Sequence, residues 1–370
     1  MKVAPLHKHA DHDRAKEDGS ITASQSSSTL LDSRNCRPST PELKTVLAAF
    51  QRPSSVKAAW QLTNSLVSYV FVWVLMFWSL KISYLLSLAL SIAAGALVVR
   101  VFIIMHDCGH GSFTKSRLLN DIIGSIAGIV VFTPYYHWRW EHAVHHGTAA
   151  DLDRRGTGDI WTMTVQEYLQ SPLRVRLAYR ALRQPIVLFA LAPIFVFGFR
   201  NRFASRTAGR RERWSVWWTN AGVALIILGL SSLFGWKTYL ASQLVITMVG
   251  GGIGIWMFYI QHQFEGVYWE RHENWDYVAA ALKGSSFYQL PKFFQWLSGN
   301  IGFHHIHHLN PRIPNYNLER CHRSHSVFHN VQTVTLAGSL ASARLNLWDE
   351  RCRRLVGFGQ LKSIHRRSKF

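Results

Sequence analysis

Histidines gather in three short clusters of this 370-residue sequence, which holds 19 histidines in all. The clusters are MHDCGH with His106 and His110, EHAVHH with His142, His145 and His146, and FHHIHH with His304, His307 and His308. Residues three or four positions apart share one face of a helix, so each cluster can direct its imidazoles at one point. Imidazole nitrogen is a ligand for iron, zinc, copper and nickel. The clusters therefore predict a transition-metal site.

The number of imidazoles predicts two metal ions, because eight of them exceed what one ion accepts. His262, in QHQFE, is a ninth candidate ligand. His305 faces away from its neighbours on a helix and is predicted not to be a ligand, and His137 is predicted to be structural or to support a ligand. The other histidines that follow the second cluster are predicted to be surface or packing residues: His272, His322, His325, His329 and His365.

Acidic residues near the clusters are candidates for orienting the ligands. A metal-bound imidazole usually donates its second nitrogen to a carboxylate or a carbonyl group. Asp107, Glu141 and Glu265 are the predicted partners, and Asp151 and Asp153 are further candidates. Each of the five could equally be a solvated charge.

The elements that must position these histidines include four long apolar stretches. Residues 66–80, 82–99, 214–236 and 238–260 contain no charged residue. A bilayer core needs about 20 apolar residues of helix, so we predict spans at roughly 62–80, 82–105, 216–236 and 238–260. The alternative is buried helices of a large soluble protein, which rarely stay uncharged on all faces over such lengths.

The predicted spans form two tight hairpins, which turn near Lys81 and Lys237. The apolar segment 185–199 is too short to cross a bilayer comfortably, so we predict that it lies in the interface or re-enters. The three clusters then share one side with the basic segments 174–183 and 200–213. Because Lys and Arg concentrate in cytoplasmic loops, this pattern predicts a multi-pass protein of the cell membrane whose active site faces the cytoplasm.

Composition narrows the possible partners and the domain organisation. The net charge is +20, but no nucleic-acid motif accompanies it, which favours an anionic membrane surface over nucleic acid. The four scattered cysteines (Cys36, Cys108, Cys321 and Cys352) predict no disulfide framework. The polar segment 1–40, with His7, His9 and His12, has no signal-peptide core and is predicted to be disordered and cytoplasmic. We predict a membrane domain at 41–335 and a basic tail at 336–370.

The three clusters resemble the histidine boxes of the membrane-bound fatty acid desaturases, over about residues 60–320. HDCGHGSFTKSR, HWRWEHAVHHGTAADLDRRGTGDIWT and NIGFHHIHHLNPRIPNYNL are especially similar to bacterial and cyanobacterial acyl-lipid desaturases of the Δ12 (omega-6) group. The first box is HxxxH, as in that group. The resemblance implies that the eight box histidines, together with His262, bind two non-haem iron ions.

The resemblance also implies the reaction and its partners. Two ferrous ions would activate O2, the co-substrate, and a cis double bond would form in a fatty acyl chain of a membrane lipid. The sequence shows no haem-binding HPGG segment and no cysteine run for an iron–sulfur cluster, so a separate donor such as ferredoxin would supply electrons. Basic loops could dock an acidic donor. Aromatic residues near the spans could line an acyl tunnel or form an interfacial belt.

Together these features predict an all-α membrane protein with four transmembrane helices in two hairpins, interfacial helices and a histidine-rich cytoplasmic cap that holds the di-metal site. Two alternatives stay open. A di-iron membrane hydroxylase or ketolase of an alkane, an acyl chain or a carotenoid would have the same boxes. A membrane metal transporter or metal-binding protein is a non-enzymatic alternative, but transporters place their ligands near the middle of the spans.

Overall fold

The computed structural model describes residues 40–361 and residue 363. Most of the predicted N-terminal segment, with its three histidines and Cys36, lies outside these described residues, as do residue 362 and residues 364–370 of the predicted tail. The described residues belong to one compact unit.

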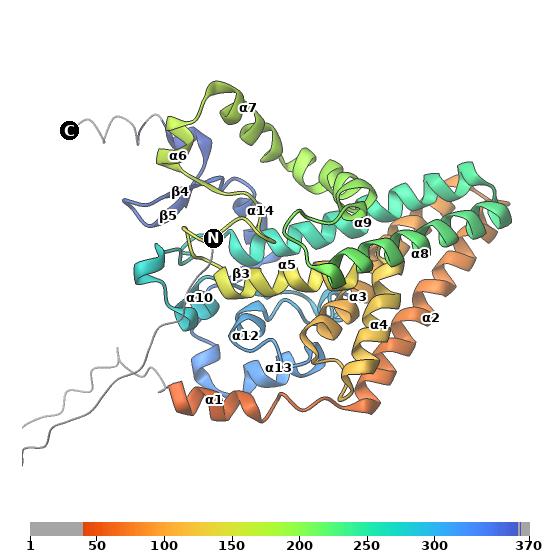
Figure 1. The fold of residues 1–370 in the computed structure, drawn as a ribbon, viewed down its shortest axis with the longest axis horizontal. Coiled ribbons are helices and arrows are strands. Elements are labelled where there is room, and N and C mark those ends of the chain that lie inside the picture. Colours follow the sequence, from red (N-terminus) through yellow and green to blue (C-terminus); the bar gives the residue numbers. More distant parts are fainter. Residues whose placement is uncertain (1–39, 362, 364–370) are drawn as a thin grey trace, which may run out of the picture. The chain divides into compact units, whose positions relative to one another are not determined.

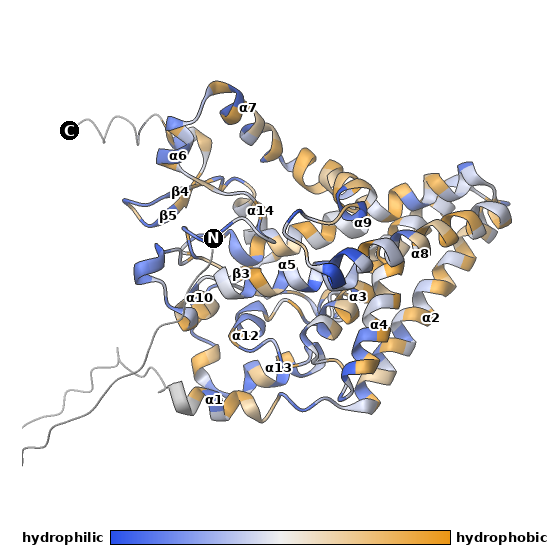
Figure 2. Cartoon of the chain, viewed as in Figure 1, coloured by the Kyte–Doolittle hydropathy of each residue, from blue (hydrophilic) through white to orange (hydrophobic). Residues whose placement is uncertain are grey.

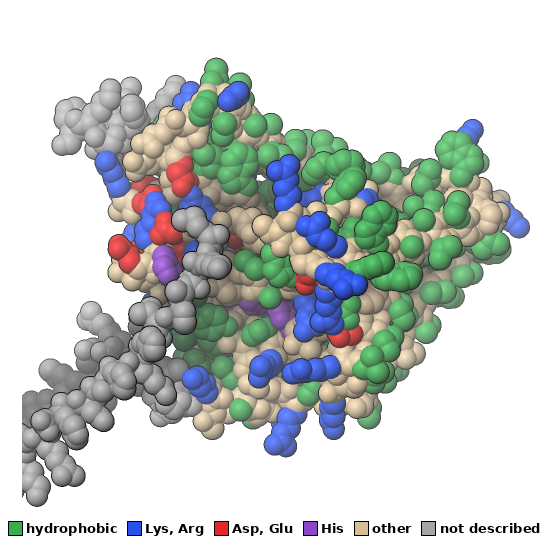
Figure 3. Space-filling model, viewed as in Figure 1, with side chains coloured by type: hydrophobic (Ala, Val, Ile, Leu, Met, Phe, Trp, Pro, Cys, Tyr) green, Lys and Arg blue, Asp and Glu red, His purple; other side chains and the backbone are tan. Residues whose placement is uncertain are grey.

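Within the described residues, four helices are long and apolar enough to cross a membrane: α2 (Ser55–Ser79), α3 (Tyr84–His110), α8 (Arg210–Phe234) and α9 (Trp236–His262). They form two hairpins that extend to the right in Figure 1, and their ribbons are mostly apolar in Figure 2. Apolar side chains such as Phe71, Leu85, Leu225 and Leu228 are exposed on them, and hydrophobic atoms cover this part of the surface in Figure 3. The predicted all-α membrane architecture is confirmed.

The observed helices are longer than the predicted spans at the ends that lie near the histidines. α2 begins seven residues before position 62, where the Ser54 side chain accepts a hydrogen bond from the Lys57 N–H. α3 continues to His110 and ends at Gly111, which has a φ of 67°. His106 and His110 therefore belong to the membrane helix itself, and α9 likewise ends at His262.

Glycines let α3 and α9 approach closely. A Cβ atom on Gly250 would lie 2.3 Å from Val98 Cγ1 and 2.7 Å from the Gly95 carbonyl oxygen, and a Cβ on Gly95 would lie 2.8 Å from Val249 Cβ. Small residues of this kind allow helix backbones to pack tightly in membranes. Because both helices end at histidines, this contact fixes the relative position of the two sets of ligand candidates.

Two helix pairs are sharply bent. α4 (Arg117–Val130) and α5 (Tyr135–Thr148) meet at 101°, and α7 (Leu173–Leu182) meets the helical segment Val187–Arg202 at 67°. That segment consists of the π-helices Val187–Leu191 and Ile194–Phe199 followed by a 3₁₀ turn at Arg200–Arg202. By length and composition, each pair fits a broken span or a re-entrant loop. The expectation that 185–199 does not cross stays a prediction.

Short elements form a cap at the histidine-bearing ends of the long helices. The helices are α1 (Thr40–Ala48), α6 (Val165–Gln170), α10 (Tyr277–Lys283), α11 (Lys292–Leu297), α12 (His304–Leu309), α13 (Asn315–Ser324) and α14 (Leu336–Ser342), with single 3₁₀ turns at His272–Asn274, Ser326–Phe328 and Phe358–Gln360. A main core in the cap includes the buried Tyr259, Ile306 and Trp348.

Short strands of two or three residues also occur in the cap: β1 (Met163–Thr164), β2 (Phe287–Gln289), β3 (Thr333–Thr335), β4 (Leu347–Asp349) and β5 (Arg354–Val356). β4 pairs in parallel with β1 and antiparallel with β5, while β2 and β3 pair in parallel. Leu347 and Val356 pack with Met163 and Tyr179. Part of the predicted tail is thus packed against the membrane domain.

Candidate metal centre

Nine histidines converge in two groups whose ligand atoms lie within 4.8 Å of one another inside each group. We call them group A and group B. Group A contains His106, His110, His142, His146 and His307, and group B contains His145, His262, His304 and His308. All nine candidates from the sequence are brought together, and each of the two groups offers enough imidazoles for one metal ion.

The two HxxHH clusters contribute to the groups in opposite ways. α5 gives its i,i+4 pair, His142 and His146, to group A and the intervening His145 to group B. α12 gives its i,i+4 pair to group B and the intervening His307 to group A. The helical repeat places the intervening histidine about 60° from the first member of the pair and about 100° from the second, so each helix can serve both groups.

The membrane helices complete the two groups. α3 delivers His106 and His110 to group A, and α9 delivers His262 to group B. The glycine contact between α3 and α9 therefore sets the distance between helix ends that serve different groups. This is the structural reason why residues about 150 positions apart in the sequence meet here.

The ring nitrogens fit bound metal ions. The Nε2 atoms of His146 and His307 are 2.9 Å apart, and those of His262 and His304 are 3.0 Å apart. Five buried ring nitrogens of the groups have no hydrogen-bond partner, namely His110 Nε2, His145 Nε2, His146 Nδ1, His304 Nδ1 and His308 Nε2. Buried polar atoms are normally paired. The unpaired Nε2 atoms of His110, His145 and His308 are therefore compatible with a di-iron site.

Burial keeps the imidazoles of α12 neutral, which is the form that binds metal. His304, His307 and His308 are 1–2% exposed. Burial, reinforced by the neighbouring imidazoles, lowers the pKa of each of them well below 6.5. At neutral pH each of these imidazoles is therefore uncharged and has a nitrogen lone pair that can bind a metal ion.

Three acceptors orient individual imidazoles through Nδ1. Asp107 Oδ1 lies 3.1 Å from His106 Nδ1, and the Gly284 carbonyl oxygen lies 3.1 Å from His262 Nδ1. Asp159 Oδ1 lies 2.6 Å from His145 Nδ1. Each contact leaves Nε2 free to face the group, as metal-bound imidazoles require.

Asp159 was missed by the sequence reasoning, although it lies in the quoted segment RRGTGDIWT. The preceding Gly158 has a φ of 75°, and a Cβ there would lie 2.9 Å from the Glu141 carbonyl oxygen and 3.2 Å from His145 Cβ. Only glycine tolerates both the backbone conformation and the close approach. The glycine beside an aspartate was the available signal, since it marks a loop pressed against α5.

Two of the expected acidic partners do not contact the groups. Glu141 accepts a hydrogen bond from Arg200 at 2.6 Å and lies 3.9 Å from His137 Nδ1, so its carboxylate is taken up by these partners. Glu265 is exposed, beyond the end of α9. Asp151 and Asp153, the further candidates, pair with Arg154 and His272 and with Arg271 respectively. Only Asp107 lies as expected.

Among the described residues, the histidines that were not predicted to be ligands lie outside both groups. His305 is fully buried but faces the other way, and its Nε2 lies 3.3 Å from His322 Nδ1. His137 Nε2 accepts a hydrogen bond from the Ser205 N–H. His137 therefore ties the basic loop before α8 to α5, which is a structural role.

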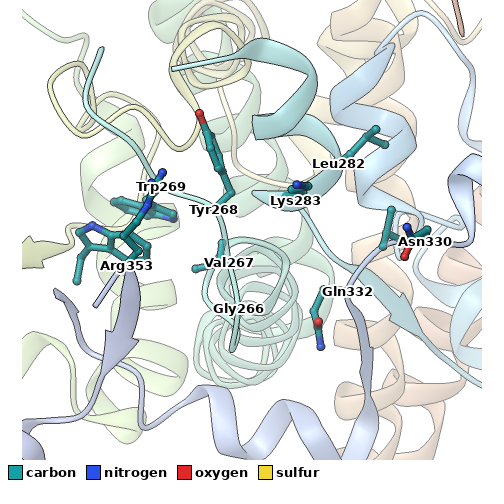
Figure 4. Close-up of a pocket in the computed structure, with 11 residues that line it drawn as sticks. Gly266, Val267, Tyr268, Trp269, Leu282, Lys283, Asn330, Gln332 and Arg353 are labelled. Atoms are coloured by element: carbon teal, nitrogen blue, oxygen red, sulfur yellow. The ribbon is translucent and has the colours of Figure 1, made fainter. Parts of the chain in front are cut away.

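Cavities near the centre differ in size. A cavity of about 20 Å³ beside group B is lined by His145, Asp159, Phe258 and His262, and is large enough for about one water molecule. A larger cavity of about 420 Å³ lies in the cap, between the loop at Gly266–Trp269, Lys283, Gln332 and Arg353 (Figure 4). It is lined by none of the nine histidines.

Comparison with known proteins shows which family this sequence matches. Residues 82–329 match the family model described as "Fatty acid desaturase". A Bacillus subtilis protein named "Fatty acid desaturase" is 45% identical over 323 residues, which cover 87% of this chain and 92% of that protein.

Two Synechocystis proteins are more distant relatives. An "sn-1 oleoyl-lipid 12-desaturase" is 28% identical over 243 residues, covering 62% of this chain and 65% of that protein. An "sn-1 acyl-lipid omega-3 desaturase (ferredoxin)" is 28% identical over 246 residues, covering 61% of this chain and 63% of that protein.

Proposed function

The chain belongs to the fatty acid desaturase family, whose members are oxidoreductases of lipid metabolism, and on this premise we propose that it is an O2-dependent di-iron enzyme that introduces a cis double bond into fatty acyl chains of membrane lipids. We further propose the Δ12 (omega-6) position. The single observation that carries the di-iron proposal is the convergence of nine imidazoles in two groups.

In this proposal each group holds one iron ion. His106, His110, His142, His146 and His307 are the ligands of one, and His145, His262, His304 and His308 are the ligands of the other. Bound ferrous ions would supply the activation of O2 and the oxidising power needed to remove hydrogen from two adjacent methylenes. The protein supplies binding, orientation and the exclusion of water.

The residues around the groups have defined tasks in this proposal. Asp107 and Asp159 accept hydrogen bonds from the Nδ1–H groups of His106 and His145, which fixes the ring planes and raises the basicity of Nε2. The Gly284 carbonyl does the same for His262. The burial of α12 keeps bulk water away from three of the proposed ligands.

The Δ12 position depends on the likeness of the histidine boxes to the omega-6 group and on the name of one Synechocystis relative. The Bacillus subtilis relative carries no position in its name, and another Synechocystis relative is named for omega-3. The position is therefore a proposal to be tested separately from desaturation itself.

Electrons reach the centre from a separate acidic donor, ferredoxin or a similar protein, in this proposal. The support is the name of the omega-3 relative, which includes ferredoxin, and the excess of Lys and Arg in the chain. The same excess in the loops supports a cytoplasmic active site in the cell membrane.

The test is expression in a host that makes only saturated and monounsaturated fatty acids, followed by mass spectrometry of fatty acid methyl esters from aerated and anoxic cultures. A new diene that requires oxygen is expected, and its double bond gives the position. The His304→Ala variant should lose the product, whereas His325→Ala, which changes an exposed histidine outside both groups, should retain it. A hydroxylated acyl chain would replace the proposal with a hydroxylase, and full activity of His304→Ala would refute the ligand assignment.

A further inference from the structure

A cleft of about 330 Å³ with charged and amide side chains in its lining lies where the cap meets the first membrane hairpin. Its lining includes Lys57, Gln61 and Arg100 from α2 and α3, and Lys292, Gln295 and Glu319 from α11 and α13. In Figure 1 the chain between α1 and α2 runs along α13, and hydrogen bonds from Ser54 N–H to Tyr316 Oη and from Lys57 Nζ to Asn317 Oδ1 hold this arrangement.

The charges in the cleft are unbalanced. Lys57, Arg100 and Lys292 face a single carboxylate, Glu319, which leaves two positive charges uncompensated. Glu319 pairs with Lys292 and Arg323, whereas neither Lys57 nor Arg100 pairs with a carboxylate of the described residues. Arg100 is 5% exposed, and its polar contacts are neutral groups, the Asn64 amide oxygen and the Trp296 carbonyl. A buried cation without a counter-charge is costly, so an anion is the ligand that this cleft suits.

An unpaired amide donor in the cleft also favours an anion. Gln61 is 4% exposed, yet its Nε2 atom has no hydrogen-bond partner among the described residues. Buried polar atoms are normally paired. An anionic ligand with several oxygen atoms would accept hydrogen bonds from both Gln61 Nε2 and Lys57 Nζ.

The depth of the cleft matches the edge of a bilayer. Trp60 lies 19 residues from the far end of α2 and Arg100 lies 16 residues from the far end of α3, which correspond to about 28 Å and 24 Å of helix. The hydrocarbon core is about 30 Å thick. Trp60 is 70% exposed and Phe293 is 64% exposed, as aromatic residues at a membrane interface are. The anionic group available at this depth is the phosphate of a lipid.

The cleft is also connected to group A. Asn315 lines the cleft, and its backbone N–H and side-chain Nδ2 donate to Asp107 Oδ2 at 2.6 Å and 2.8 Å. The other oxygen of Asp107 contacts His106 Nδ1. Two contacts therefore separate the cleft from a ligand candidate, so a lipid held here would have its glycerol close to the centre.

We propose that this cleft binds the phosphate of a membrane phospholipid and that the acyl chain of this lipid is the substrate. That the acyl chain of this lipid is the substrate rests on the proposed desaturase function, whereas the binding of its phosphate in the cleft does not. Lys57 and Arg100 provide the charge, Gln61 donates a hydrogen bond, and Trp60 and Trp296 flank the glycerol region. An acyl thioester of coenzyme A or of a carrier protein would approach from the aqueous side and would not need these groups.

The test measures lipid binding by the purified, iron-loaded full chain in detergent, by native mass spectrometry. The probes are dipalmitoyl-phosphatidylglycerol and dipalmitoylglycerol, which have the same chains and differ by the phosphate headgroup. Wild-type protein should prefer the phospholipid. Lys57→Gln and Gln61→Leu should each reduce this preference roughly tenfold, while binding of dipalmitoylglycerol stays unchanged and shows that the variants are folded.

Lys237→Gln is the matched control, because Lys237 is exposed at the opposite end of the long helices. A preference for the phospholipid that survives in both cleft variants would overturn the proposal. So would displacement of the lipid by excess inorganic phosphate, or an equal loss of palmitoyl-coenzyme A binding in the variants. Selective phospholipid binding by a chain that forms no new double bond in the expression host of the preceding test would refute the desaturase proposal and leave the headgroup site standing.

Discussion

Group A and group B differ in how many imidazoles they have and in where their support comes from. Group A has five imidazoles, and the carboxylate that contacts it, Asp107, follows directly after His106 on α3. Group B has four imidazoles and depends on two acceptors from loops, Asp159 and the Gly284 carbonyl. The small cavity of the centre lies beside group B.

This difference indicates that group A is built largely by helices and group B largely by the packing of loops against them. A helix fixes its own side chains locally, whereas a loop acceptor needs the whole cap to be folded. The lower imidazole count and the adjacent cavity also leave more room around group B for a small molecule. We therefore expect group B to be the more sensitive of the two to substitution.

The largest effect is expected from removing one imidazole from each group. His304→Ala leaves three imidazoles in group B and should abolish product and reduce the iron content to one ion per chain. His110→Ala leaves four in group A and should retain part of the second ion at lower affinity. Iron per chain by mass spectrometry, with product analysis, measures both. Equal iron loss in the two variants would contradict the proposed difference.

A smaller effect is expected from the orienting carboxylates. Asp159→Asn and Asp107→Asn keep the size of the side chain but remove its charge, and each should weaken metal binding by about 10–100-fold. Competition with a chelator measures the affinity. Because Asp107 also accepts two hydrogen bonds from Asn315, its variant should lower the thermal stability as well. Loss of iron from group A in the Asp159→Asn variant would mean that the two groups do not bind iron independently.

The contact between α3 and α9 should affect both groups together. Gly250→Val would push side-chain atoms into Val98 and the Gly95 carbonyl, and we expect a loss of about 1–3 kcal/mol in stability. Thermal melting in detergent and iron content measure the result. Gly254→Ala is the control, since a Cβ at Gly254 meets nothing within 4 Å. An unchanged melting temperature of Gly250→Val would show that the helices are not held by this contact.

The smallest effect is expected at a histidine outside both groups. Burial lowers the pKa of His322 to about 4, against about 6.5 in an unfolded chain. Between these values the unfolded chain takes up a proton that the folded chain does not, so stability should fall as the pH drops from about 6.5 to 4. His322→Phe should reduce this acid-induced drop in melting temperature by about 2 °C, whereas His325→Phe should not. The same drop in both variants would assign the acid sensitivity to other groups.

Much of this structure could be predicted from the sequence where local geometry decides. The long uncharged stretches predict the membrane helices, and the i,i+3,i+4 spacing predicts shared faces. The same reasoning fails where partners come from elsewhere in the chain. Glu141 is next to His142 in the sequence but turns toward Arg200, while Asp159 reaches His145 from a loop.

The sequence by itself determined that nine imidazoles are available, that they lie at the ends of apolar helices or on short helices beyond them, and that one ion could not use them all. Only the tertiary structure decided how they divide. α5 and α12 share their imidazoles between both groups in opposite senses, and this depends on the rotation and position of each helix. The physical reason is that spacing fixes angles within one helix, whereas packing, here a glycine contact between α3 and α9, fixes the distances between helices.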